Sequence, residues 1–174
     1  MNGYDVQLVA AILAAIFWNS TSVFLQKRWR VYDVFIGKKH ALLVHGLLIS
    51  FAWCQVLVVA IFVTRSTWIF DSIPSLGMLV FASAVWLFVM AVKDIGMGSL
   101  VNSNFFGRHL STKSQLYEKL KHPIYLSYIL MFVGIGISSG QFGYLLAAAS
   151  LLIGLSLLAY IEKPVVAKNL HKHK

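Results

Sequence analysis

Five long apolar segments dominate the chain, and polar residues are concentrated in the connections between them. The segments cover residues 6–25, 41–64, 76–92, 123–140 and 143–161. A helix of about 17–25 apolar residues is long enough to cross the hydrocarbon core of a bilayer. Lipid offers no partner to unpaired backbone groups, which excludes open strands at membrane depth. The pattern therefore predicts an all-α fold, a polytopic membrane helix bundle with five transmembrane helices.

The composition agrees with a membrane protein rather than a soluble one. Of the 174 residues, 59% are hydrophobic and only 12% are charged, whereas a soluble domain averages roughly 45–50% apolar and about 25% charged residues. The length suits a single transmembrane domain over residues 1–174, with no separate soluble domain. Because Cys54 is the only cysteine, a disulfide framework and a multi-cysteine metal site are both excluded.

Basic residues fall almost entirely on alternate connections. Lys and Arg number five in residues 26–40, five in the loop 93–122 and four in the tail 162–174, whereas residues 65–75 hold only Arg65. Five spans place the three basic segments on one side of the membrane. The positive-inside rule then predicts that this side is cytoplasmic, with the N-terminus outside and the C-terminus in the cytoplasm.

The same distribution explains the net charge of +9. Basic residues beside helix ends meet anionic lipid headgroups, so the bilayer itself is the expected partner. The sequence contains no recognisable nucleic-acid-binding motif, and we expect no nucleic-acid partner. The first apolar segment lacks a cationic start and a cleavage site, which indicates a retained span rather than a signal peptide. We expect a multi-pass protein of a bacterial inner membrane or of the endoplasmic reticulum.

The loop 93–122 is the longest connection, and it contains an adjacent pair of phenylalanines, Phe105 and Phe106. Exposed loops rarely hold such a pair. We therefore expect the loop to fold back against the membrane face, with Arg108 and His109 as candidate substrate-binding residues.

The end of this loop carries the most informative chemistry. Pro123 suits the first turn of a helix, where its missing N–H costs nothing. The other first-turn N–H groups lack helical partners and favour an anion. Lys121 and His122 add donors beside them, and Tyr125 lies three residues after His122, so that the two rings can share a face.

The last two segments are joined by a very short turn, which predicts an antiparallel hairpin. Their lengths nearly match, so Glu162 should return to about the depth of His122. A carboxylate would then lie opposite an anion site at the same membrane surface. A ligand with both a cationic group and a carboxylate fits that polarity, although Glu162 and Lys121 could instead form an ordinary interfacial pair.

These residues resemble a family motif. Tyr117, His122, Pro123, Tyr125 and Gly134 fall at matching positions of the isoprenylcysteine carboxyl methyltransferase and phospholipid methyltransferase superfamily, and Glu162 falls where its first acidic residue would be. The superfamily's arginine and one of its glycines are replaced by Lys121 and Ser127.

The resemblance implies a cytoplasmic S-adenosylmethionine site. Its cofactor-binding residues would be Tyr117, Lys121, His122, Pro123, Tyr125 and Glu162. The resemblance further implies methyl transfer to a lipophilic small-molecule acceptor that enters from the bilayer. A prenylcysteine carboxylate, a phospholipid amine and a small thiol remain open as acceptors, and no catalytic residue is assigned.

Two other functions remain open. A non-catalytic bundle of the same fold could bind lipid or a protein partner, with the basic residues near Trp29 as its surface. A redox relative could use a nicotinamide cofactor. Inside the second segment, His45 is either a hydrogen-bonded bundle histidine or a haem or metal ligand, and we predict no metal site.

Overall fold

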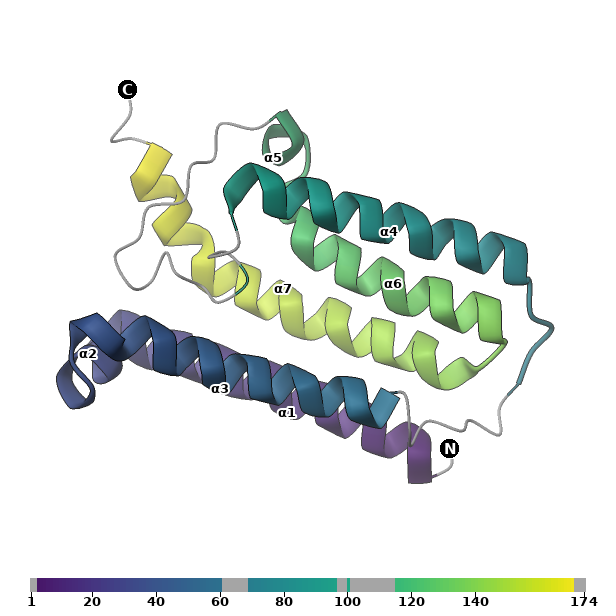
Figure 1. Cartoon of the computed structure of the whole chain (residues 1–174), viewed down its shortest axis with the longest axis horizontal. Coiled ribbons are helices and arrows are strands. Elements are labelled where there is room, and N and C mark those ends of the chain that lie inside the picture. Colours follow the sequence, from purple (N-terminus) through teal and green to yellow (C-terminus); the bar gives the residue numbers. More distant parts are fainter. Residues whose placement is uncertain (1–2, 61–68, 97–99, 101–114, 171–174) are drawn as a thin grey trace.

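The computed structural model describes residues 3–60, 69–96, 100 and 115–170, with the side chains of residues 3–5, 115, 118 and 161–170 left out (Figure 1). Nearly all of these residues are helical, and no strand longer than one isolated bridge occurs among them. The predicted all-α fold is therefore confirmed for this part of the chain.

Seven helices are present in the described residues. In chain order they are α1 (Gly3–Trp29), α2 (Val31–Phe35), α3 (Lys38–Val58), α4 (Pro74–Ile95), α5 (Gln115–Lys119), α6 (Pro123–Ser139) and α7 (Phe142–Leu170). Four helical stretches are long and apolar enough to cross a membrane, namely Val6–Trp29, Lys38–Val58, Pro74–Ile95 and Phe142–Tyr160. The fifth, α6, is apolar but has 17 residues, which is at the short end of the range of about 17–25 for a spanning helix.

Several helices are longer than the apolar segments that predicted them. α7 continues to Leu170, beyond the expected start of the tail at residue 162. A helix satisfies its own backbone hydrogen bonds, so it need not stop where the apolar composition stops. The short helices α2 and α5 lie in connections that the sequence pattern left irregular. The expected end of the second span, residues 61–64, lies outside the described residues.

The bundle is built from two groups of antiparallel helices (Figure 1). α6 packs between α4 and α7, α1 packs on α3, and α1 also contacts α7, which joins the groups. The largest apolar core lies where α1, the end of α3 and α7 meet. Its fully or nearly fully buried members include Leu8, Ile12, Val56, Leu151 and Leu158.

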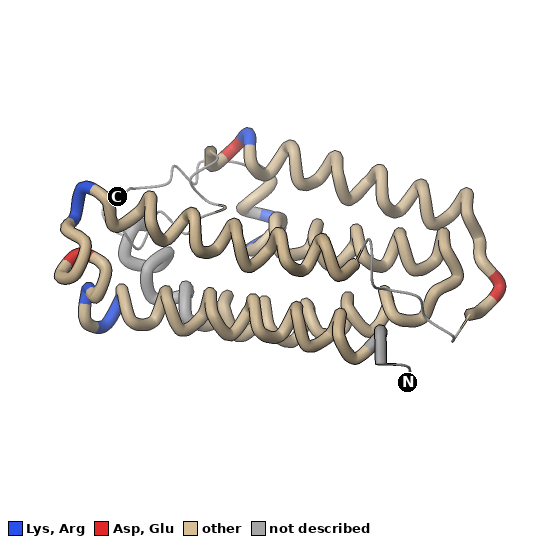
Figure 2. Tube along the Cα trace, turned by 60° about the horizontal axis from the view of Figure 1, so that its bottom comes forward, with Lys and Arg blue, Asp and Glu red and all other residues tan. Residues whose placement is uncertain are grey.

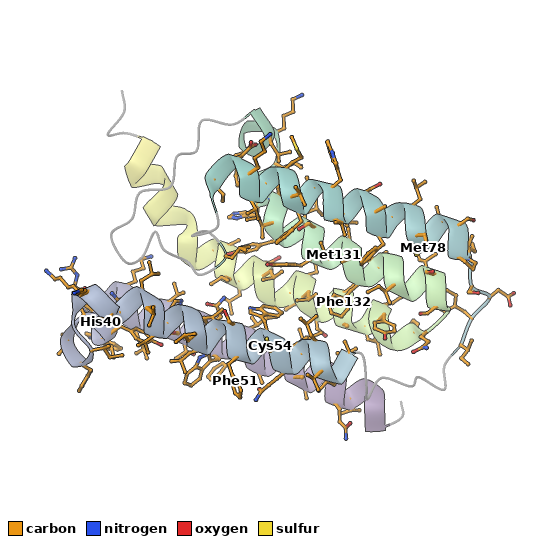
Figure 3. All side chains as sticks on the ribbon, viewed as in Figure 1. His40, Phe51, Cys54, Met78, Met131 and Phe132 are labelled. Atoms are coloured by element: carbon orange, nitrogen blue, oxygen red, sulfur yellow. The ribbon has the colours of Figure 1, made fainter. Side chains whose placement is uncertain are left out.

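Aromatic residues extend this core toward α6. Phe132 of α6, labelled in Figure 3, packs its ring against Tyr144 of α7 with the ring centroids 6.4 Å apart. The Tyr144 hydroxyl donates a hydrogen bond of 2.9 Å to the carbonyl oxygen of Ala60, just after α3. In lipid, such a bond ties two helices together because few other partners exist for the hydroxyl.

Two glycines allow α4 and α6 to approach at backbone distance. A Cβ atom placed on Gly134 would lie 2.7 Å from the Phe81 nitrogen and 2.9 Å from the Gly77 oxygen. A Cβ atom on Gly77 would meet the backbone of Ser138 and Gly134. Small residues at such crossings are typical of membrane helices, whose association depends on close packing. Gly134 therefore positions α6 against α4.

The turn between α6 and α7 is fixed from outside the hairpin. Gly140 adopts φ +68°, a conformation that favours glycine. The Phe70 nitrogen donates to the Gly140 oxygen at 2.9 Å, and the Ile73 nitrogen donates to the Ile137 oxygen at 3.1 Å. The segment before α4 thus holds the end of the hairpin by backbone hydrogen bonds.

The described basic residues all lie at one set of helix ends. They occur at the end of α1, just before α2, at the start of α3, at the end of α4, in α5 and just before α6 (Figure 2). Asp71 lies beyond the opposite helix ends. This arrangement agrees with the predicted segregation of charge, while Arg65 lies outside the described residues.

The close contact of α4 with α6 can be tested by adding one methyl group. We expect Gly134→Ala to lower the free energy of unfolding by about 1–3 kcal/mol, since the added carbon overlaps backbone atoms that cannot move aside easily. Thermal or detergent-induced unfolding of the purified protein measures the change. Ala82→Leu adds a larger group to the exposed face of α4 and should leave stability nearly unchanged. Equal effects of the two substitutions would contradict the assignment.

Candidate functional site

The rings of His122 and Tyr125 stack against each other at the start of α6. Their centroids are 5.3 Å apart and their planes differ by only 4°. Both side chains are partly buried, and Tyr125 packs against the apolar core. The sequence spacing of three residues predicted a shared face, and the structure brings the rings into contact. The pair forms an aromatic surface at the N-terminal end of α6.

α6 begins at Pro123, as its sequence predicted. Pro123 occupies the first turn and is fully buried, and His122 is the N-cap residue without a side-chain capping hydrogen bond. The first-turn N–H groups of any helix lack intrahelical carbonyl partners and carry partial positive charge. Lys121 adds an exposed full charge directly before them. This end of α6 is therefore suited to an anionic group.

Burial and charge both disfavour protonation of His122. Burial lowers the pKa of this imidazole below its usual 6.5, and the nearby Lys121 ammonium lowers the pKa further. His122 is consequently neutral at pH 7. A neutral imidazole offers one N–H donor and one acceptor nitrogen, so that it can orient a ligand by both kinds of hydrogen bond.

The short helix α5 brings Tyr117 to the end of α4. The Tyr117 hydroxyl donates a long hydrogen bond of 3.4 Å to the Ala91 oxygen. Ala91 is fully buried one turn before the end of α4. The structure therefore gives Tyr117 a role in joining α5 to α4.

Three candidate residues cannot be placed by their side chains. Glu162 lies within α7, but its side chain is outside the described part of the structure. Arg108 and His109 lie wholly outside the described residues. The helices still constrain Glu162, because α7 runs antiparallel to α6 and its C-terminal part lies at the same end of the bundle as Pro123 (Figure 1).

The lengths of α6 and α7 give the depth of Glu162 relative to Pro123. From Phe142 to Glu162 the rise along α7 is about 30 Å, and from Ser139 back to Pro123 it is about 24 Å. The backbone of Glu162 thus lies roughly one turn past the level of Pro123. The backbone of Glu162 is therefore within about one helical turn of the expected depth.

Ser127, which stands where the resembling superfamily motif has a glycine, is accommodated within α6. It is fully buried, and its hydroxyl donates a hydrogen bond of 2.7 Å to the Ile124 oxygen in the preceding turn. Such a bond satisfies the hydroxyl within its own helix. The replacement therefore leaves no unpaired polar group beside the site.

An aromatic cluster one turn further along α6 escaped the sequence reasoning. The Tyr128 ring lies 6.0 Å from Trp53 of α3 and 5.6 Å from Phe88 of α4, measured between centroids. Tyr128 follows Tyr125 by three residues, so that the cluster continues the face of the candidate site into the membrane. The spacing of Tyr125 and Tyr128 was the available signal, but the partners on α3 and α4 could not be read from the sequence.

His45 lies in a different part of the bundle. It is fully buried in α3, and its Nδ1 atom is 2.8 Å from the Ser22 hydroxyl of α1. Within the described residues, no group of three or more His, Cys, Asp or Glu side chains could hold a metal ion. The hydrogen bond agrees with the interpretation of His45 as a bundle histidine.

The comparison with known families identifies the region that contains this site. The family model described as phospholipid methyltransferase matches residues 72–173, which is more than half of the chain. Neither a curated protein nor a solved structure matches the chain. The matched region includes α4 to α7, and thus all the residues proposed for the candidate site.

The protonation of His122 can be measured directly. We expect NMR titration of histidine-labelled protein to give a pKa below 6.5, with the signal assigned by its loss in His122→Gln. Lys121→Gln should raise this pKa without restoring it fully, because burial is the larger cause. The lowered pKa also fixes the direction of the pH dependence of stability. The unfolded chain binds this proton more readily than the folded chain, so the free energy of unfolding is not reduced by this group above pH 6.5 and falls as the pH decreases below that value. A pKa at or above 6.5 would contradict the buried position.

Proposed function

We propose that this chain, which belongs to the phospholipid methyltransferase family, transfers a methyl group from S-adenosylmethionine to a lipophilic acceptor. Its four long apolar helices and its family identify it as an integral membrane protein of a methyltransferase family. The observation that carries the finer proposal is the His122–Tyr125 pair at the start of α6, inside the matched region.

The residues at this end of α6 fit the cofactor's charges. The methionine part of S-adenosylmethionine carries a carboxylate and an ammonium group beside a cationic sulfonium. Lys121 and the first-turn N–H groups of α6 would hold the carboxylate. The aromatic faces of His122 and Tyr125 attract cationic groups, and Glu162 would complete the site from α7. Pro123 fixes the start of the helix on which these groups depend.

The protein is proposed to contribute to catalysis by positioning the methyl donor and the acceptor. When bound, S-adenosylmethionine supplies an electrophilic methyl group on sulfur. The buried first turn of α6 would hold the donor side, and the aromatic cluster of Tyr128, Trp53 and Phe88 would exclude water from the adjoining membrane side. Aligning two reactants and excluding water can supply several kcal/mol of the required acceleration, up to roughly 7–11 kcal/mol in well-oriented systems.

The acceptor is proposed to enter from the bilayer. The aromatic cluster continues the site's face along α6 toward membrane depth, which favours an apolar substrate. Arg108 and His109 are proposed to contact its polar group. The candidate classes are a prenylcysteine carboxylate, a phospholipid amine and a small thiol.

The proposed active face is cytoplasmic, in a bacterial inner membrane or the endoplasmic reticulum. The start of α6 lies at the same helix ends as the described basic residues (Figure 2). The positive-inside rule assigns that side to the cytoplasm, where the water-soluble cofactor is available. The N-terminus would then lie outside.

Cofactor binding provides the first test. Calorimetric titration of the reconstituted full chain with S-adenosylmethionine should detect binding, and His122→Ala or Glu162→Gln should weaken it at least tenfold. His40→Ala and Asp71→Asn remove the same groups elsewhere and should leave binding unchanged. His40 lies at the start of α3 (Figure 3), and Asp71 lies before α4. Absence of binding by the folded protein in lipid would refute the proposal.

Transfer of a labelled methyl group identifies the acceptor class. We expect radioactivity from methyl-labelled S-adenosylmethionine to enter the lipid phase of native membranes. Mild base releases it from a methyl ester, but not from an N-methyl or S-methyl product, and chromatography separates the latter two. Cofactor binding without methyl transfer to any of the three acceptor classes would favour the non-catalytic bundle over the enzyme.

A further inference from the structure

A second surface lies at the connection between α1 and α3, outside the residues of the family match. We call residues 27–40 the elbow; they contain the end of α1, the short helix α2 and the start of α3. The matched region begins at residue 72, so that the properties of the elbow do not depend on methyl transfer. The elbow combines a fixed backbone, basic charge and exposed apolar side chains.

A hydrogen-bonded chain holds the elbow to the helices beneath it. The Ser22 hydroxyl of α1 lies 2.5 Å from the Tyr32 hydroxyl of α2 and 2.8 Å from Nδ1 of His45 in α3. The Tyr32 and His45 rings also pack edge to face, with centroids 5.4 Å apart. Ser22 and His45 are buried. These contacts connect α1, α2 and α3 through a single polar network.

Gln26 provides a second connection. This buried side chain donates to the Asp33 carboxylate at 3.1 Å and accepts from the Tyr32 backbone nitrogen at 3.1 Å. Arg30, whose Nε lies 3.8 Å from the same carboxylate, adopts φ +53°. A left-handed residue other than glycine is unfavourable and persists where its surroundings fix it. Side-chain hydrogen bonds from α1 therefore hold the backbone of the elbow in place.

The elbow turns apolar side chains outward. Phe35 is 82% exposed, Val34 72% and Trp29 58%. Exposed basic residues lie before and after them in the sequence, at Lys27, Arg28, Arg30, Lys38 and Lys39. The one acidic residue of the elbow, Asp33, is partly buried and already bonded to Gln26 and close to Arg30, so that it does little to offset the outward positive charge.

We propose that the elbow binds anionic phospholipids, with its Lys and Arg side chains on the headgroups and Phe35, Val34 and Trp29 in the upper acyl region. Each basic residue close to an anionic membrane surface contributes about 1 kcal/mol. A soluble polyanion would satisfy the charges but would leave these apolar side chains in water. The position of the elbow at the ends of α1 and α3 places both kinds of side chain where headgroups and hydrocarbon meet.

The proposal is tested by lipid titration of the purified full chain in a neutral detergent. Phosphatidylglycerol should bind with an affinity that depends on Lys38 and Lys39 and should raise the melting temperature, whereas any binding of phosphatidylcholine should be unchanged by their substitution. Lys38→Gln/Lys39→Gln should raise the Kd for phosphatidylglycerol by roughly 30-fold, as two charges at about 1 kcal/mol each require. Lys93→Gln/Lys119→Gln removes two exposed charges at the same helix ends but outside the elbow, and should raise the Kd less than threefold.

Competition with anions that lack acyl chains distinguishes a phospholipid-binding site from a simple anion site. Glycerol phosphate and heparin, which lack acyl chains, should displace phosphatidylglycerol only weakly. Equal losses in the two double variants, or displacement by glycerol phosphate at the concentration of lipid itself, would overturn the proposal. Neither result bears on S-adenosylmethionine binding, which uses α6 and α7.

A depth measurement checks the apolar part independently of charge. A nitroxide placed by Phe35→Cys, in a Cys54→Ser background, should be more accessible to oxygen than to an aqueous nickel reagent in phosphatidylglycerol vesicles. The same label at residue 71, in Asp71→Cys, provides the reference at the opposite helix ends. A label at residue 35 that is readily reached by the aqueous reagent would also overturn the proposal.

Discussion

α7 returns antiparallel along α6, and the arrangement of the candidate site follows from this hairpin. Its turn is held by Gly140 in a left-handed conformation and by the Phe70 backbone hydrogen bond. A Cβ atom on Gly140 would lie 2.5 Å from the Phe70 oxygen. With one end of the hairpin fixed in this way, the other ends of α6 and α7 must lie at the same membrane surface.

Under the proposed function, that geometry gives a small membrane bundle a place for a charged cofactor. The membrane interior excludes unpaired charge, so that the polar groups are collected at helix ends. The start of α6 contributes amide donors, Lys121 and the stacked pair of His122 and Tyr125. The remaining length of α6 contributes aromatic and apolar side chains that face other helices rather than water. In the proposed function, the charged and the lipophilic reactant would therefore approach this place from opposite directions.

Much of the fold and of the candidate site could be predicted from the sequence, because the signals that predict them are local. Pro123 marked the start of α6 because a proline is compatible with a first turn and with few other helix positions. The short turn after Ser139 predicted the hairpin because neighbouring helices with so short a connection must run antiparallel. Charge counts predicted which helix ends lie together. Each of these inferences needed only neighbouring residues or whole-segment composition.

Contacts between distant helices could not be predicted in the same way. Gly134 packs on Gly77 and Phe81 of α4, a contact that its position in the sequence did not specify. The Tyr128 cluster and the network from Ser22 to His45 depend on which faces meet, and apolar segments without a marked polar face do not specify that. The short helices α2 and α5 also escaped detection, since five residues give too little periodicity to recognise.

The proposed site requires that the start of α6 and the part of α7 around residue 162 lie at one membrane surface. The most direct measurement is the distance between nitroxides at Lys121→Cys and Glu162→Cys, in a Cys54→Ser background, by pulsed electron paramagnetic resonance in lipid. The structure predicts a single distribution well below the roughly 30 Å thickness of the hydrocarbon core. A distribution at or beyond that thickness would place the two ends on opposite surfaces and contradict the account.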